Sequence, residues 1–486
     1  MNHLILLVVL PLLSAFIIPV VAKHSLTISR LIGPVVLVFI LALVVLSWAS
    51  VGSNSFAIFL GGFLPPVGIV FYIDHFSLML SGLIAGMLLI VWPWSSYVAP
   101  RQYSLYMLLT AASFGLVLSA DLFNLYVFYE LLAVATYGLI ARQKKPAAAV
   151  AALRYLFVSA TGSAMLLLGI AIIYTLTGTL NIAHLATMTD QLHGLAGLSA
   201  FALIVIGAGV KAEMFLLNTW VPEVYSTIET PLAALLAGLI SKLAIVLIIR
   251  VLLMLFQQPE VLQMLLVVGV FGVISGEMVA WRAKDMLRML SFSSIAQLGM
   301  IFIAFSIAGE VGLWIGLALM LHHLLVKGGL FLLADKMQGS FDNLRGYAKR
   351  SAMAVAIFII FILSLLGIPP FPGFWIKLML ILNLAEQNNT IYHYAIGFIL
   401  LATVIEAAYL FKLVRYLFQD EEAATIASTP KGLTYWYAQL FALVLLVSLA
   451  FISPISNRLK DMASQVANPD VYINTILPSH LSGGNP

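Results

Sequence analysis

The feature that most constrains this chain is a series of apolar runs, each long enough to cross a lipid bilayer. A spanning helix needs about 20 apolar residues, and it satisfies its own backbone hydrogen bonds inside the membrane. Such runs predict fourteen transmembrane helices, at residues 4–22, 30–48, 72–97, 103–120, 122–141, 153–177, 198–228, 231–256, 261–281, 287–308, 311–336, 352–386, 392–418 and 434–453. We therefore expect an all-α polytopic membrane protein.

The composition excludes several other classes of protein. Hydrophobic residues make up 62% of the 486 residues and charged residues only 9%, which is more apolar surface than a soluble core could bury. The net charge of +4 is what basic loops give a membrane protein, so it implies no nucleic-acid partner. The chain has no cysteine, which rules out disulfides, thiolate metal sites and iron–sulfur ligation. The first apolar run lacks a basic segment before it, and we interpret it as the first helix rather than a cleaved signal.

Lysine and arginine collect in alternate loops. They follow the first, third, fifth, ninth and eleventh predicted helices and surround the end of the thirteenth, and they include Lys144, Lys336 and Lys431. The opposite loops contain none, at 49–71, 178–197, 257–260 and 387–391. Because basic loops stay on the cytoplasmic side, this pattern predicts a multi-pass protein of the cell inner (plasma) membrane with both termini outside.

Two of the predicted helices are long and interrupted. The segment 198–228 contains Gly207, Gly209 and Pro222, and the segment 352–386 contains "GIPPFPG" at 367–373. Proline breaks the backbone ladder of a helix. These are helices 7 and 12, five spans apart, which predicts two inverted five-helix repeats (helices 4–8 and 9–13) with an ion path near the broken helices. The expected organisation is one membrane domain with four sections: 1–97, 103–256, 261–418 and 434–486.

Several charged residues lie deep in the predicted helices. At 1.5 Å per residue, Lys211 is roughly 18 Å and Lys242 roughly 16 Å from the start of its helix, and a lysine side chain reaches only about 6 Å. Neither lysine can reach the membrane surface, so both are functional candidates. Glu130 lies near the middle of its helix and needs a proton or a cation. Lys377 follows the break in helix 12.

Other polar residues allow two interpretations. His323 and Lys327 lie one turn apart and suit a proton wire, although a buried histidine can equally be a structural hydrogen-bonding group. Glu406 and Lys412 form either a second charged step or a structural pair. Glu213 and Glu277 are either functional or contacts for a neighbouring subunit. No histidine and carboxylate spacing suits a metal, and no phosphate-binding loop or catalytic triad occurs, so we predict no metal site, no cofactor and no enzymatic activity.

Five stretches together resemble a known family. They are "ADLFNLYVFYELLAVATYGLIA" at 120–141, "GVKAEMFLLNTWVPEVYSTIETPLAALLAGLISKLAIVLIIR" at 209–250, "MLSFSSIAQLGM" at 289–300, "LHHLLVKGGLFLLADKM" at 321–337 and "SLLGIPPFPGFWIKLMLI" at 364–381. In collinear order they resemble the antiporter-like subunits of Mrp-type cation/proton antiporters, respiratory complex I and membrane-bound hydrogenases. The chain is most similar to the D-type Mrp subunit, on the motifs "DLFNLYVFYE" and "HHLLVK".

The resemblance implies a function and a set of site residues. The chain would be the proton-translocating subunit of a multisubunit Na⁺ (cation)/H⁺ antiporter, assembled with other membrane subunits in the lipid bilayer. Protons would pass along a buried axis that consists of Glu130, Lys211, Lys242, His323, Lys327 and Lys377, with Glu406, Lys412 and Glu213 as additional candidates. The chain departs from the family pattern at Asn218, where many relatives have histidine, and at Glu213 and Glu406. Because a row of ammonium groups repels metal cations, we expect Na⁺ to cross mainly through a partner subunit or an interface.

Alternative functions remain open from the sequence. The first is an antiporter-like proton-pumping subunit of complex I (N-type) or of a membrane-bound hydrogenase, driven by an electron-transfer arm. The second is a subunit of an inorganic-carbon uptake complex or a membrane scaffold. Scaffolding is disfavoured, because buried lysines that served no activity would each cost several kcal/mol of desolvation.

Overall fold

The computed structural model describes residues 2–51, 55–94, 99–143, 145–335, 337, 340–419 and 432–478. Three of the basic loop residues noted above, Lys144, Lys336 and Lys431, lie outside the described residues, as does the end of the tail at 479–486. The rest of the chain is almost entirely helical, with one short β-hairpin. This confirms the prediction of an all-α membrane protein.

Ten helical segments in the described part of the chain are long and apolar enough to cross a membrane: His3–Val21, Leu26–Val51, Leu122–Ala141, Pro146–Thr177, Thr230–Leu255, Pro259–Arg282, Met286–Phe305, Gly309–Ala334, Thr390–Phe418 and Leu433–Val466. Four shorter apolar helices, at His75–Ile90, Leu195–Gly209, Ala352–Leu366 and Pro372–Ala385, lie within predicted spans. The exact number of fourteen crossings therefore stays a prediction.

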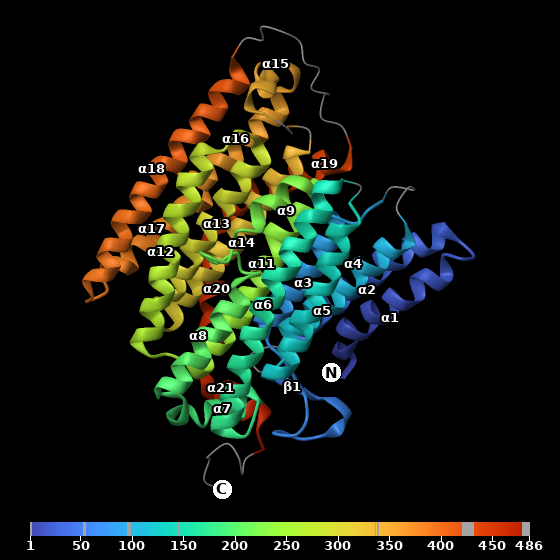
Figure 1. Cartoon of the computed structure of the whole chain (residues 1–486), viewed down its shortest axis with the longest axis vertical. Coiled ribbons are helices and arrows are strands. Elements are labelled where there is room, and N and C mark those ends of the chain that lie inside the picture. Colours follow the sequence, from blue (N-terminus) through green and yellow to red (C-terminus); the bar gives the residue numbers. More distant parts are fainter. Residues whose placement is uncertain are drawn as a thin grey trace. The chain divides into compact units, whose positions relative to one another are not determined.

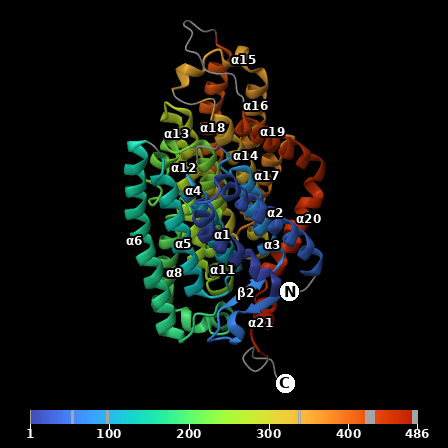
Figure 2. The same ribbon diagram turned by 90° about the vertical axis from the view of Figure 1, so that its right-hand side faces the viewer.

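The chain divides into two compact units. Unit 1 comprises Met1–Ala212, Lys242–Gln258 and Ser464–Pro486. Its elements in the described residues are α1 (Leu6–Val21), α2 (Leu26–Val51), β1 (Phe56–Phe59), β2 (Val70–Ile73), α3 (His75–Ile90), α4 (Pro100–Leu118), α5 (Leu122–Ala141), α6 (Pro146–Thr177), α7 (Ile182–Ala186), α8 (Leu195–Gly209), nearly all of α11 (Ser241–Leu255) and α21 (Pro469–Ile476). The longest of these helices, α6, packs along α8 (Figure 2).

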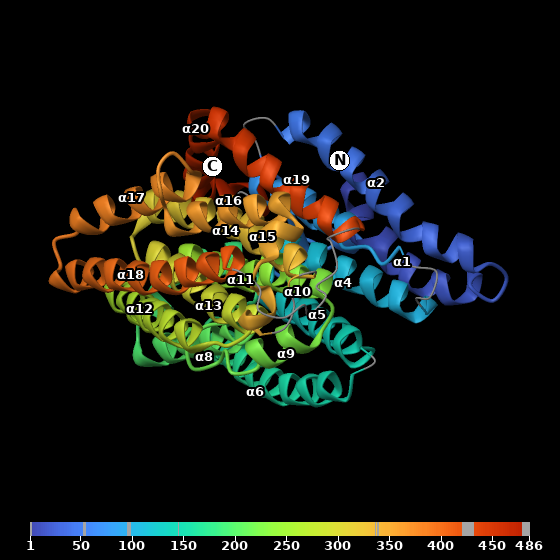
Figure 3. The same ribbon diagram turned by 90° about the horizontal axis from the view of Figure 1, so that it is seen from above.

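Unit 2 comprises Glu213–Ser241 and Pro259–Ala463. Its described elements are α9 (Val221–Thr227), α10 (Thr230–Leu235), the π-helical turn η4 (Leu236–Ile240), α12 (Pro259–Arg282), α13 (Met286–Phe305), α14 (Gly309–Ala334), α15 (Tyr347–Arg350), α16 (Ala352–Leu366), α17 (Pro372–Ala385), α18 (Thr390–Phe418), α19 (Leu433–Ser448) and most of α20 (Ile452–Val466). Within it α12 packs against both α13 and α18, as Figure 3 shows. The boundary between the units falls inside the predicted section 103–256, because 213–241 belongs to unit 2.

The same local structure occurs at the start of α5 and at the start of α13. Asp121 caps α5 by accepting a hydrogen bond from the backbone N–H of Asn124, and Asp285 caps α13 in the same way at Arg288. Each aspartate also forms an isolated β-bridge, to Asn181 in unit 1 and to Ser340 in unit 2. The predicted repeats place α5 and α13 at equivalent positions. The shared capping structure therefore favours the prediction of two repeats.

Both predicted helix breaks are present. Helix α8 ends at Gly209 and α9 begins at Val221, and the connecting backbone contains two residues other than glycine with positive φ, Glu213 (56°) and Leu216 (72°). Helix α16 ends at Leu366, and Gly367 follows in the left-handed region, where glycine has no Cβ to clash. Breaks of this kind leave backbone polar groups that side chains can bind.

Helices α12 and α13 approach each other unusually closely through glycines. A Cβ atom on Gly269 would lie 2.7 Å from the carbonyl oxygen of Gly299, and one on Gly299 would lie 2.6 Å from that of Gly269. Any larger side chain would force the helices apart. This contact fixes the position of α12 on α13.

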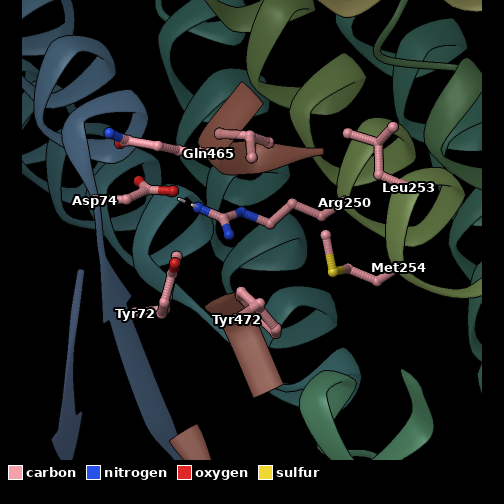
Figure 4. Close-up of a pocket in the computed structure, with 8 residues that line it drawn as sticks. Tyr72, Asp74, Arg250, Leu253, Met254, Gln465 and Tyr472 are labelled. Carbon is pink, nitrogen blue, oxygen red and sulfur yellow. Dashed lines mark ion pairs between the residues drawn. The ribbon is translucent and has the colours of Figure 1, made fainter. Parts of the chain in front are cut away.

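The C-terminal helix α21 closes one end of unit 1. It packs against α7 and β1, and all three lie at the lower end of Figure 1. Figure 4 shows a small cavity there, where Tyr472 of α21 and Tyr72 of β2 flank the guanidinium of Arg250, which lies 4.0 Å from Asp74. Burial and the neighbouring Asp74 carboxylate raise the pKa of Tyr72, so its hydroxyl stays protonated. The buried ion pair joins α11 to the start of α3, where Asp74 is the N-cap.

Candidate functional site

Lys211 lies directly after the end of α8 and is almost fully buried. Its ammonium nitrogen lies 3.2 Å from the ring centroid of Tyr129 and 3.3 Å from the Ser159 hydroxyl, to which it donates a hydrogen bond. The Tyr129 hydroxyl in turn donates to the carbonyl oxygen of Gly207, in the last turn of α8, over 2.7 Å. The cation is thus held by an aromatic face and a hydroxyl, both of which suit an ammonium group.

Glu130 is near Lys211 but does not contact it. The two side chains interact electrostatically within unit 1, yet no ion pair joins them in the described structure. Glu130 is half-buried, and its Oε1 atom is shielded from solvent without a hydrogen-bond partner in the described part of the chain. The structure therefore places Glu130 and Lys211 near each other but does not join them in an ion pair.

Lys242 is also buried, as its distance from the helix start predicted. It is the second residue of α11, directly after the π-helical turn Leu236–Ile240. A π-helical turn inserts an extra residue into the helix and is common at functional sites. Nothing in the residues of this segment indicated that turn.

His323 and Lys327 lie one turn apart on α14, as predicted, and both contact serines of α13. The Lys327 ammonium donates a hydrogen bond of 2.6 Å to Ser293, and His323 Nε2 lies 3.1 Å from the Ser294 hydroxyl. Both side chains are buried. Because α13 presents two adjacent hydroxyls to α14, these contacts can conduct protons by exchange of hydrogen bonds.

The second broken helix also carries a buried lysine. Lys377 of α17 forms an ion pair of 3.1 Å with Glu406 of α18 and donates to the carbonyl oxygen of Leu366, at the end of α16, over 3.4 Å. The other carboxylate oxygen of Glu406 accepts a hydrogen bond of 3.0 Å from Gln297. In unit 2 the lysine at the break, Lys377, therefore forms an ion pair with Glu406. In unit 1 of the described structure, Lys211 forms no ion pair with Glu130.

Two sequence-based alternatives are wrong. Glu406 does not pair with Lys412, because six residues of helix place the two on different faces, and Lys412 is exposed. Glu213 and Glu277 do not present a docking surface, because they are 1% and 2% exposed. Each accepts a hydrogen bond from a tyrosine of its own unit, Glu213 from Tyr225 over 2.6 Å and Glu277 from Tyr409 over 2.8 Å.

The structure adds polar residues that the sequence interpretation did not select. Besides the tyrosines, these include His322, whose Nε2 lies 2.9 Å from the hydroxyl of Ser364 in the last turn of α16. Tyr409 lies three residues after Glu406 on α18, so helical spacing could have placed the two on one face. No group of three or more His, Asp or Glu side chains in the described residues could hold a metal ion.

The comparisons with known proteins fit this arrangement. Residues 119–405 match the family described as NADH:quinone oxidoreductase/Mrp antiporter, transmembrane. The chain belongs to this family. The match includes the six principal candidates, from Glu130 to Lys377, and ends one residue before Glu406.

The relatives include both an NADH-quinone oxidoreductase subunit and a Na⁺/H⁺ antiporter subunit. The chain is 30% identical to the N-type subunit of the NADH-quinone oxidoreductase of Desulforudis audaxviator, over 84% of this chain and 85% of the relative. It is 29% identical to the D-type subunit of the Na⁺/H⁺ antiporter of Alkalihalophilus pseudofirmus, over 97% of this chain and 99% of the relative.

Two solved structures of membrane complexes contain a similar chain. One is an archaeal membrane-bound sulfane sulfur reductase, with a TM-score of 0.91 and 27% identity over 98% of this chain and 100% of that chain. The other is the Mrp complex from Dietzia sp. DQ12-45-1b, with a TM-score of 0.90 and 25% identity over 98% of this chain and 99% of that chain. Members of the family thus occur as subunits of larger membrane assemblies.

Proposed function

We propose that the chain is the proton-translocating subunit of a multisubunit Na⁺ (cation)/H⁺ antiporter of the Mrp type. The alignment with the D-type antiporter subunit supports this most directly, since it covers 97% of the chain and 99% of the relative, against 84% and 85% for the NADH-quinone oxidoreductase relative. The chain is a secondary-transporter subunit rather than an enzyme. It works with other membrane subunits, in the cell inner (plasma) membrane, with both termini outside.

In unit 1, Lys211 and Glu130 act as a proton switch. A lysine near a carboxylate holds its proton more firmly than one in an uncharged, buried setting. Movement of Lys211 between Glu130 and the ring of Tyr129 therefore changes how readily it releases a proton. Lys242, buried on α11, is the next carrier in this unit.

In unit 2, the carriers are His323, Lys327 and Lys377. The serines of α13 contact the first two, and Glu406 holds the third. A proton that leaves Lys377 leaves Glu406 without its cation, so opening and closing of this pair controls the last step. The broken helix of this unit leaves the Leu366 carbonyl outside the helical ladder, where it accepts a hydrogen bond from Lys377.

The test is antiport in everted membrane vesicles that contain the assembled complex. We expect Lys211→Ala and Glu130→Ala each to reduce Na⁺-dependent proton antiport at least tenfold, because each removes one partner of the switch. The control is Lys23→Ala, since Lys23 is an exposed lysine in the turn between α1 and α2. Antiport at the control level in both variants would contradict the proposed function.

A second candidate function is that of a proton-pumping subunit in a redox-driven complex. The 30% identity to an NADH-quinone oxidoreductase subunit and the similar chain in a sulfane sulfur reductase favour it. Purification of the native complex decides between the two. Small membrane subunits alone would support the antiporter, and iron–sulfur subunits would support the redox-driven pump.

A further inference from the structure

Glu277 is a buried carboxylate that the proposed relay does not use. It lies on α12, and its only hydrogen-bond partner in the described structure is the hydroxyl of Tyr409 on α18, which donates to Oε2 over 2.8 Å. No cation lies within ion-pair distance of it in the described part of the chain. A buried carboxylate without a cation is costly when ionised, so this position favours a group that takes up a proton.

The groups that face Glu277 come from each helix packed around it. Glu406 and Tyr409 lie on α18, Lys327 on α14 and Lys377 on α17, and all four act on Glu277 electrostatically or by hydrogen bonding. From α13 come the uncharged side chains of Ser293 and Gln297. With both lysines and both glutamates ionised, these four residues carry no net charge, and the Glu213 carboxylate acts on Lys327 in addition.

Release of a proton by Lys327 would leave this group with one uncompensated negative charge. Two neighbouring carboxylates cannot both remain ionised at little cost when only one cation is present. Glu406 keeps its ion pair of 3.1 Å with Lys377, whereas Glu277 has only the Tyr409 hydroxyl. Glu277 is therefore the carboxylate that accepts the proton.

A line of polar side chains leads from Lys327 to Glu277. The Lys327 ammonium donates to the Ser293 hydroxyl over 2.6 Å, Ser293 lies beside Tyr409, and the Tyr409 hydroxyl donates to Glu277 over 2.8 Å. The close glycine contact joins α12, which carries Glu277, to α13, which carries Ser293.

We propose that Glu277 is a proton-storage residue at the end of a branch that leaves Lys327 through Ser293 and Tyr409. Lys327 gives a proton to Ser293, Ser293 gives its own to Tyr409, and Tyr409 gives its own to Glu277. Lys327 becomes a neutral amine and Glu277 a neutral carboxylic acid, and both hydroxyls are restored. The store lets Lys327 discharge while the Lys377–Glu406 pair is closed; this role in transport rests on the proposed function.

The experiment uses the purified complex and infrared difference spectroscopy between acidic and alkaline buffer, in H₂O and D₂O. We expect the wild type to show a protonated carboxylic acid band that Glu277→Gln removes. The control is Glu260→Gln, because Glu260 is an exposed carboxylate on the same helix α12. A band that persists unchanged in Glu277→Gln would overturn the inference.

Antiport measurements give the second readout. Glu277→Gln and Tyr409→Phe should each lower antiport several-fold, while Glu260→Gln leaves it unchanged. Tyr409→Phe keeps the ring and removes only the hydroxyl, so it serves if Glu277→Gln fails to assemble; antiport equal to the control in Tyr409→Phe would also overturn the inference. Because the infrared band does not depend on antiport, the assignment of Glu277 can fail separately from the proposed function, which Lys211→Ala and Glu130→Ala test.

Discussion

At the scale of single residues, Tyr129 gives Lys211 a binding position that carries no negative charge. Its ring lies under the ammonium group, and its hydroxyl binds the Gly207 carbonyl at the end of α8. A buried cation–π contact contributes about 2 kcal/mol. Tyr129 thus contacts both the Lys211 ammonium and the last turn of α8, so the position of the lysine depends on the helix break. A carboxylate that contacted only the lysine would not make this connection.

This geometry predicts different effects for two substitutions of Tyr129. Tyr129→Leu removes the ring face, so we expect antiport to fall roughly thirtyfold, in line with the loss of about 2 kcal/mol. Tyr129→Phe keeps the face and loses only the hydroxyl, so it should retain most of the activity. Antiport in everted vesicles measures both, with Phe123→Leu, an exposed aromatic of the same helix, as the control. Equal losses in the Phe and Leu variants would show that the ring face does not matter.

At the scale of elements, the two breaks use different backbone solutions. The break after α16 places glycine where φ is positive, whereas the connection after α8 places Glu213 and Leu216 there. Residues with a Cβ in this region cost of order 1 kcal/mol or more. The buried Glu213 side chain accepts a hydrogen bond from Tyr225, which offsets the cost of its positive φ. The Leu216 side chain is 74% exposed, so its packing offsets little of that cost.

Leu216→Gly should therefore stabilise the protein. Glycine adopts φ near 72° without a Cβ clash, and little packing is lost because the side chain is exposed. We expect a gain of about 1 kcal/mol in the free energy of unfolding, measured as a higher midpoint of thermal unfolding of the purified complex. The matched control is Leu195→Gly, an equally exposed leucine in helical conformation at the start of α8, which should lower the midpoint. A lower midpoint for Leu216→Gly would contradict the argument.

At the scale of the whole molecule, the buried charges favour a division of labour between this chain and its partners. Lysines dominate the candidate residues, and no group of three or more His, Asp or Glu side chains in the described part of the chain suits a metal ion. Ammonium groups repel a metal cation, yet they relay protons by alternating between charged and neutral forms. We therefore propose that the proton branch belongs to this subunit and that the metal ion crosses mainly elsewhere in the complex.

The substitutions Lys377→Ala and Glu406→Ala test this division in the assembled complex. Lys377→Ala should reduce proton flux strongly, because it leaves Glu406 buried without a cation, while the apparent affinity for Na⁺ stays nearly constant. Glu406→Ala should likewise leave the Na⁺ affinity unchanged. Flux is followed with a pH-sensitive dye over a series of Na⁺ concentrations. A large change in Na⁺ affinity from either substitution would place the metal site in this chain.

The class of fold and most of the candidate residues could be predicted from the amino-acid sequence. Long apolar runs demand membrane helices, the Gly and Pro clusters end α8 and α16, and lysines too deep to reach the surface must be buried; Lys211, Lys242, Lys327 and Lys377 all are. These conclusions follow from length, backbone chemistry and desolvation, which depend on local sequence.

Which buried groups contact one another could not be predicted without the packing of the helices. Glu406 pairs with Lys377 and not with Lys412, Glu277 meets Tyr409, and Lys211 rests on Tyr129 rather than on Glu130. Each of these contacts joins segments that are far apart in sequence, and the last also depends on how α5 faces the end of α8. Apolar helix faces look alike in a sequence, whether they contact lipid or one another. The rotation and packing of the helices therefore set the partners of the buried charges.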